Sequence, residues 1–249
     1  MPFMFKILTI FLLASFFYIS PASSAPKPLE EAGRLEAQAA KLLQAGRPRA
    51  ALPLIKRSLA IAEKALSPDH PRVATELNNL AMVHQALGQL DKAGPLFRRS
   101  LAIREKAFGP GHPSVAVALN NLAGFHQVQR HFKKAETFYR RALAIREKAL
   151  GPRHLDVGLS LKNLGEIYRL QRRFKESGPY FRRAVSIFEK ALPPGNPRVL
   201  GGLDKLATIY QAQGKFKESV PFIRRGLAIR EKSLGPEHIE VAKTLNNLA

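Results

Sequence analysis

The stretch that decides the fold is Leu-Asn-Asn-Leu-Ala at 77–81, which returns unchanged at 119–123 and at 245–249. The first two copies are 42 residues apart, and the third falls three further periods along the chain. A second block, Arg-Arg-Ser-Leu-Ala-Ile-Arg-Glu-Lys at 98–106, recurs at 140–148 with one substitution. Two blocks sharing one period identify internal repeats, the sequence signature of a stacked architecture.

Each period is predicted to begin with an amphipathic helix. Leu77, Leu80, Ala81 and His84 stand at i, i+3, i+4 and i+7, the spacing that places side chains on one helical face. Gly88 follows directly after this pattern and is expected to end the helix.

A second helix is predicted from about Asp91 to the Gly109-Pro110 turn, after which Pro113 opens the next period. Pro95 is expected in the first turn of this second helix, where its missing N–H costs little. Apolar residues alternate with period 2 nowhere in the chain, so strands are not expected. The sequence therefore predicts an all-α solenoid of helix pairs.

The residues that recur resemble those of a known repeat family. The pattern consists of Leu77, Leu80, Ala81, His84, Gly88, Ala93, Phe97 and Ser100. These spaced large and small residues resemble the tetratricopeptide signature, and the 42-residue period is similar to the kinesin-light-chain type of repeat. The resemblance implies a right-handed α-solenoid of antiparallel helix pairs that binds protein partners, in a bacterial-style exported version.

The resemblance covers residues 35–249. The expected units are 35–76, 77–118, 119–160, 161–202, 203–244 and an incomplete sixth at 245–249. The first unit has Glu36-Ala37 in place of the asparagine pair and is interpreted as an N-terminal cap. Because the sixth unit is incomplete, an alternative to an interaction scaffold is that the chain is the truncated regulatory arm of a longer effector protein.

The N-terminus is predicted to be an export signal. Lys6 is followed by the uncharged apolar run 7–19 and by small residues at 20–25. The predicted signal peptide is 1–25, followed by a linker at 26–34, with cleavage after Ala22 as an alternative. The protein is therefore expected in the periplasm or outside the cell, or anchored to the membrane if the signal stays uncleaved.

The composition adds a strong charge and excludes several kinds of site. Forty Lys and Arg against 19 Asp and Glu give a net charge of +21, which attracts polyanions, acidic proteins or anionic lipid surfaces. Without cysteine, the chain forms no disulfides and no thiolate metal sites. HExxH, GxSxG and P-loop motifs do not occur, so no enzymatic activity and no cofactor are predicted.

Histidines are interpreted as structural rather than metal-binding. Four of them recur once per period, too far apart along a solenoid to share a metal ion; they are His70, His112, His154 and His238, with Asn196 in the remaining place. His84 and His126 share the core column of two tyrosines and are expected to be packed, hydrogen-bonded rings.

The resemblance implies that the first helix of each pair lines a concave groove. The candidate groove residues are Asn78, Asn79, Gln85, Asn120, Asn121, Gln127, Lys162, Asn163, Arg169, Lys205 and Gln211. Amides can bond an extended peptide backbone, and the cations favour a peptide with acidic residues or a free C-terminal carboxylate. Alternatively, the asparagines bridge adjacent helices and the cations are simply solvated.

A dibasic column follows the second helices. Its members after Lys56-Arg57 are Arg98, Arg99, Arg140, Arg141, Arg182, Arg183, Arg224 and Arg225. Residues three and four beyond each arginine are not acidic, so no such local pair neutralises this basic stripe. It is predicted either to bind a polyanion with salt-sensitive affinity or only to solvate the convex face. No motif for specific nucleic-acid binding accompanies it.

Overall fold

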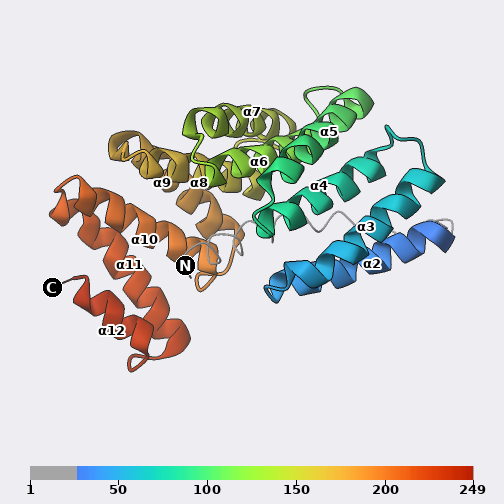
Figure 1. Ribbon diagram of the computed structural model, residues 1–249. Coiled ribbons are helices and arrows are strands. Elements are labelled where there is room, and N and C mark those ends of the chain that lie inside the picture. The colour runs from blue at the N-terminus through green and yellow to red at the C-terminus, as the bar shows by residue number, and fades with distance from the viewer. Residues whose placement is uncertain (1–26, 249) are drawn as a thin grey trace. The chain divides into compact units, whose positions relative to one another are not determined.

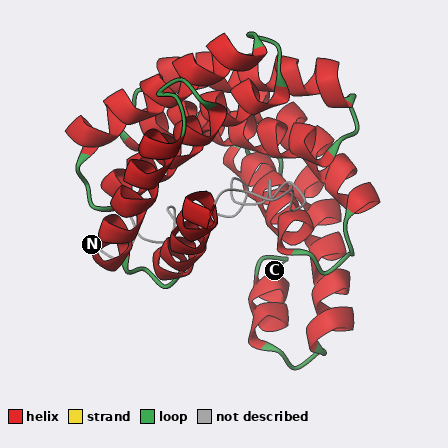
Figure 2. Ribbon diagram, turned by 90° about the vertical axis from the view of Figure 1, so that its right-hand side faces the viewer, coloured by secondary structure: helices red, strands yellow, loops and turns green. Residues whose placement is uncertain are grey.

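The computed structural model describes residues 27–248, and in this part of the chain it contains eleven α-helices and no strand (Figures 1 and 2). The predicted all-α class is confirmed. The helices are α2 (Lys27–Gln44), α3 (Pro48–Ala65), α4 (Pro71–Ala86), α5 (Leu90–Phe108), α6 (Pro113–Val128), α7 (Phe132–Leu150), α8 (Leu155–Leu170), α9 (Phe174–Ala191), α10 (Pro197–Ala212), α11 (Phe216–Leu234) and α12 (Ile239–Asn246).

The chain divides into two compact units, the first up to His131 and the second from Phe132 onward. In the first unit α2 packs on α3 and α4 on α5, and in the second α8 packs on α9 and α10 on α11 (Figure 1). From α4 onward, successive first helices begin 42 residues apart, as the sequence predicts. Each pair begins with the first helix itself, at Pro71 in the second pair, whereas the boundary drawn at 77 cuts that helix.

The segment expected to be a linker, 26–34, is helical from Lys27 on. Ala32, Leu35 and Ala39 of α2 are buried at intervals of three and four residues, so this helix has an apolar face like the others. The predicted signal peptide at 1–25 lies outside the described residues. None of the described helices combines the length and apolar character that a membrane span needs.

Glycine and proline shape the helix ends, with one departure from expectation. Gly88 and Gly109 have φ angles of 74° and 79°, which non-glycine residues rarely adopt. Pro95 is the sixth residue of α5 rather than part of its first turn. Because Pro95 has no N–H, the carbonyl of Asp91 accepts no helical hydrogen bond from it. Both residues are exposed, so water can donate to that carbonyl instead.

The first helices α4, α6, α8 and α10 bury the same leucine column between their neighbours. Leu77, Leu119, Leu161 and Leu203 are at most 1% exposed. In the second unit Gly165 lies so close to Phe181 that a Cβ would sit 2.7 Å from the phenylalanine ring. This contact brings α8 and α9 together at a separation that no larger residue at that position allows.

A buried polar network joins α2 to α4 in the first unit. Arg72 donates to Oε2 of Glu36 over 2.7 Å and to Oε1 of Glu76 over 3.4 Å. The side chain of Glu76 is fully buried, and its Oε2 accepts no hydrogen bond. Burial, reinforced by the neighbouring Glu36 carboxylate, raises the pKa of Glu76 from 4.5 to about 9, against a smaller opposing effect of the Arg72 charge. Glu76 is therefore a neutral acid at pH 7.

Candidate functional site

Four of the candidate asparagines lie inside the stack. Asn78, Asn79, Asn121 and Asn163 are between 4% and 9% exposed. Nδ2 of Asn121 donates to Oδ1 of Asn78 over 2.9 Å and joins α6 to α4, while Nδ2 of Asn79 donates to Glu36 over 3.2 Å and joins α4 to α2. These bonds confirm the helix-bridging interpretation for the asparagines that make them. Partner recognition by the same side chains stays a prediction, and the small area that they expose argues against it.

The other amide candidates also present little surface. Gln127 is buried, whereas Gln85, Asn120 and Gln211 are half-buried. Oε1 of Gln85 is buried without a hydrogen-bond partner. An extended peptide would therefore meet few free amide groups along these helices.

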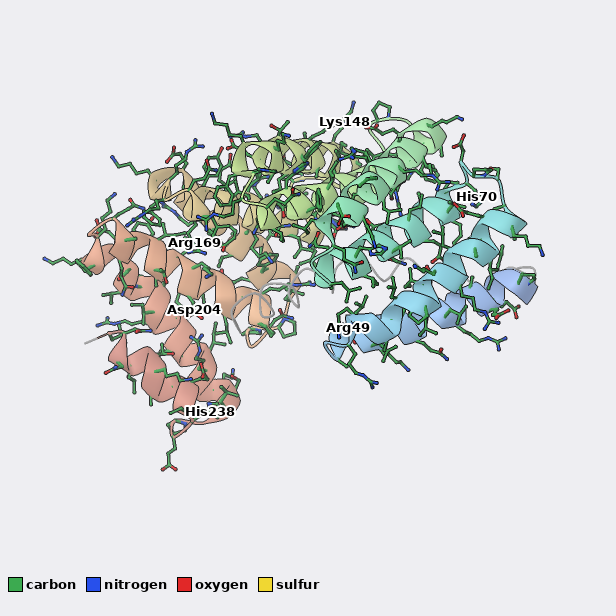
Figure 3. The ribbon with its side chains drawn as sticks, in the orientation of Figure 1. Arg49, His70, Lys148, Arg169, Asp204 and His238 are labelled. Atoms are coloured by element: carbon green, nitrogen blue, oxygen red, sulfur yellow. The ribbon has the colours of Figure 1, made fainter. Side chains whose placement is uncertain are left out.

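The cationic candidates gather in the second unit, on α8 and α10. The α8/α10 basic cluster consists of Lys162 and Arg169 from α8 and Arg198 and Lys205 from α10, around the single carboxylate of Glu166. Arg169, labelled in Figure 3, holds both oxygens of this carboxylate, with Nε 2.8 Å from Oε2 and Nη2 2.6 Å from Oε1. The one acid of the cluster is thus bound to one of its four cations.

The electrostatics of the cluster show an excess of positive charge. Burial raises the pKa of Glu166, but the hydrogen bonds and charge of Arg169 lower it, as do the charges of Lys205 and Lys162. The lowering effects together outweigh burial, so the pKa of Glu166 lies below its ordinary value. Burial lowers the pKa of Lys162, and the nearby Arg198 lowers it more, against a smaller attraction from Glu166. Lys162 is thus a partly desolvated cation facing another cation, an arrangement that an incoming anion would relieve.

Comparison with known proteins identifies the repeats. Tetratricopeptide repeat profiles match residues 40–72, 73–148, 114–190 and 199–240. The chain belongs to the tetratricopeptide repeat family. No curated protein matches the sequence.

Solved tetratricopeptide structures agree with the kinesin-light-chain type of repeat. A Podosopora anserina protein described as a kinesin light chain with nearly identical TPR-like repeats is 26% identical, with a TM-score of 0.70 over 84% of this chain and 99% of that one. BtubC (BKLC) from P. vanneervenii is 22% identical, with a TM-score of 0.71 over 93% and 92%. Aspartyl phosphate phosphatase F from Bacillus subtilis is 16% identical, with a TM-score of 0.69 over 88% and 55%. The last two show the fold alone.

In three of these tetratricopeptide repeats, the second arginine of the dibasic column pairs with an acid of the preceding second helix. Arg99 contacts Glu63 at 3.0 Å and Arg183 contacts Glu147 at 2.5 Å. The same 36-residue separation joins Arg225 to its partner. No acid follows these arginines at i+3 or i+4, as predicted, but the adjoining repeat neutralises them.

The first arginine of each pair is exposed and meets other groups where its repeat provides them. Arg140 pairs with Glu136 at 3.0 Å and donates to the hydroxyl of Tyr168. The guanidinium of Arg182 lies 5.6 Å from the ring centre of Tyr210. The remaining candidates of the stripe, Arg98, Arg141 and Arg224, are also exposed. These contacts offset part of the positive charge of the stripe.

The periodic histidines cap the first helices of the tetratricopeptide pairs. Nδ1 of His70, His112, His154 and His238 accepts the backbone N–H two residues later, at 3.0 to 3.2 Å. Oδ1 of Asn196 does the same at 3.0 Å. Figure 3 shows His70 and His238 at the starts of their helices. This shared role explains why asparagine, a preferred N-cap, stands in for histidine at the fifth place.

The remaining histidine prediction is confirmed at His84. Its ring is 6% exposed, and its Nδ1 lies 2.6 Å from Oε1 of Gln89. His126 contacts the rings of Phe125 and His131. Among the described residues, no group of three possible ligands could hold a metal ion.

Two members of the α8/α10 basic cluster were not predicted from the sequence. Arg198 is in the first turn of α10, outside the columns that define the groove, and Glu166 has no equivalent in the asparagine columns. The signal that points to Arg198 is its distance of 36 residues from Lys162, the same separation that joins Arg99 to Glu63. That separation brings side chains of neighbouring pairs together.

Proposed function

We propose that this tetratricopeptide protein is an interaction scaffold whose α8/α10 basic cluster binds an acidic segment of a protein partner. Tetratricopeptide repeats support a role in protein–protein interaction. The observation that carries the finer proposal is the excess of cations around Glu166, whose one negative charge is already held by Arg169. We further propose that the chain acts by binding alone, without catalysis.

The chemistry of the cluster favours a carboxylate as the bound group. Lys162 is partly desolvated and is repelled by Arg198, so the free protein bears an electrostatic cost at this site. A partner carboxylate placed near Lys162 and Lys205 would remove that cost and gain charge-assisted hydrogen bonds, which are stronger than neutral ones. An acidic side chain or a C-terminal carboxylate both supply this group.

The repeats themselves provide substitutions that test the proposal without disturbing the fold. Lys162 stands at the position of Asn78, and Lys205 at the position of Asn79. The Lys162→Asn and Lys205→Asn variants therefore install residues that other repeats already accept. The matched control is Lys175→Asn, which removes the same charge from an exposed site on α9.

We expect a labelled polyglutamate peptide to bind the parent chain, as measured by fluorescence anisotropy. Each cluster variant should weaken binding by about tenfold, since a lost charge-assisted contact is worth about 1.5 kcal/mol or more. The control should bind like the parent. Equal loss in all three variants would show that only net charge matters, and the cluster would then not be the site.

The second candidate, a polyanion surface along the basic stripe, is tested by the same experiment. If Arg98→Ala and Arg224→Ala abolish peptide binding while the cluster variants do not, the stripe is the site.

We also propose that the chain is exported, on the basis of the signal pattern at 1–25. Cell fractionation with N-terminal sequencing of the mature protein tests this. A cytoplasmic protein that still begins at Met1 would contradict it.

A further inference from the structure

The ends of the second helices carry an ion-pair arrangement that is electrically neutral where α5 meets the turn before α4. Lys106, near the end of α5, forms an ion pair with Asp69 in the turn before α4. Beside it, Arg99 pairs with Glu63 at 3.0 Å. Two cations and two carboxylates therefore balance at this turn.

Two periods further along the chain, only the second of these two ion pairs has a counterpart. Arg183 of α9 pairs with Glu147 of α7 at 2.5 Å, the counterpart of Arg99 with Glu63. Nη2 of Arg183 also donates to the carbonyl of Pro152 over 3.3 Å, which fixes the turn before α8 against α9.

The counterpart of the Lys106–Asp69 ion pair has a cation in place of the acid. Lys190 occupies the place of Lys106, but Arg153 occupies the place of Asp69, 84 residues earlier. No described acid forms an ion pair with Arg153 or Lys190. The equivalent residue of the other turns is Gly111, Gly195 or Glu237, so among the five turns only that of Arg153 carries a cation there.

The surface beside Arg153 and Lys190 forms a depression. A depression of about 380 Å³ is bordered by Pro152, Arg153, Arg183, Ser186, Ile187 and Lys190. Ser186 stands at the position of Ala102 of α5 and adds a hydroxyl donor at the rim. Both substitutions relative to the turn before α4 and to α5, Asp to Arg and Ala to Ser, thus add hydrogen-bond donors to one small depression.

We propose that this depression, the Arg153 depression, binds an oxyanion group, carboxylate or phosphate. The anion takes the role that the Asp69 carboxylate has beside Lys106 and pairs with Lys190 and Arg153, with Ser186 as a further donor. The Asp69–Lys106 ion pair thus shows the chemistry of the ligand within the same chain. The site lies on α9 and the turn before α8 and does not depend on the α8/α10 basic cluster.

The test uses the anion alone as the probe. The ¹⁵N-labelled full chain is titrated with sodium phosphate, and separately with sodium acetate, against sodium chloride at constant ionic strength. We expect saturable shifts at the amides of Arg153, Ser186 and Lys190. The phosphate and acetate arms show which oxyanion the site prefers.

Arg153→Asp installs the carboxylate that Asp69 supplies at the turn before α4 and should weaken anion binding by about tenfold or more. Lys175→Asp makes the same charge change on α9, at a residue that does not border the depression, and should leave binding intact. Conversely, Asp69→Arg should create a second saturable site at the turn before α4, because Lys106 then loses its partner.

The proposal is overturned if phosphate and acetate act no differently from chloride, or if Arg153→Asp binds like the parent. It is also overturned if Lys175→Asp weakens binding to the same extent, because the effect would then be general charge screening.

Discussion

The buried carboxyl of Glu76 makes the stability of the first unit depend on pH in an unusual direction. In the folded chain the pKa of Glu76 is raised from 4.5 to about 9 by burial and by Glu36, whereas the unfolded chain ionises it near the ordinary value. Between these two values, unfolding releases a proton, so stability is fully present below about pH 4.5 and falls as pH rises. This is opposite to the behaviour of a salt-bridged carboxylate.

The size of the effect follows from the protons released. One proton contributes about 1.4 kcal/mol per pH unit, so the Glu76 contribution falls by roughly 3 kcal/mol between pH 6 and pH 8. Glu76→Gln keeps the shape and the neutral charge of the protonated acid and removes this dependence. The variant should therefore equal the parent near pH 5 and exceed it in stability at pH 8.

Urea unfolding followed by circular dichroism, at several pH values, gives the difference between parent and variant. The difference cancels the pH dependence of all other groups that the substitution leaves unchanged. If this difference stays constant from pH 6 to pH 8, or if the parent becomes the more stable chain at high pH, Glu76 is ionised in the folded state and the reasoning is refuted.

Three further predictions concern stability and are measured by the same unfolding assay. His112→Ala should cost about 1 kcal/mol by removing an N-cap, while His112→Asn should retain most of the stability; equal losses in both would mean that the cap bond contributes nothing. Gly165→Ala should destabilise the second unit by about 1–3 kcal/mol, because its Cβ meets the ring of Phe181 at 2.7 Å, whereas Gly201→Ala, with open space around it, should stabilise α10 by about 0.5–1 kcal/mol; the reverse order would contradict the packing. Arg225→Ala should change stability by less than about 1 kcal/mol, because its ion pair is exposed; a larger loss would show that the ion pairs between neighbouring second helices stabilise the repeat stack.

The 42-residue period was enough to predict the helices, because the leucine column and the turn glycines repeat with it. Leu77, Leu119, Leu161 and Leu203 are buried and Gly88 ends its helix, as expected. The N-terminal helix was missed at its start because 26–34 does not repeat the later blocks. Pro95 was placed too early because the rule that favours proline in a first turn neglects a carbonyl that water can reach.

The site was harder to predict because repetition shows which positions are equivalent, not which side chains meet. Asn78 and Asn121 come from different periods and bond to each other only because α4 and α6 approach there. The acid that neutralises Arg99 is 36 residues earlier, in the preceding pair. Lys162 was predicted as a candidate because it departs from the asparagine column. Arg198 could be assigned to the cluster only from the way neighbouring helix pairs pack.

The central claim is that the α8/α10 basic cluster holds the acidic group of a partner. Its most direct test is the structure of the chain with a bound polyglutamate peptide. We predict a peptide carboxylate within hydrogen-bonding distance of Lys162 and Lys205, with Glu166 still held by Arg169. A peptide that instead lies along the arginines of the second helices, with Lys162 untouched, would contradict the account.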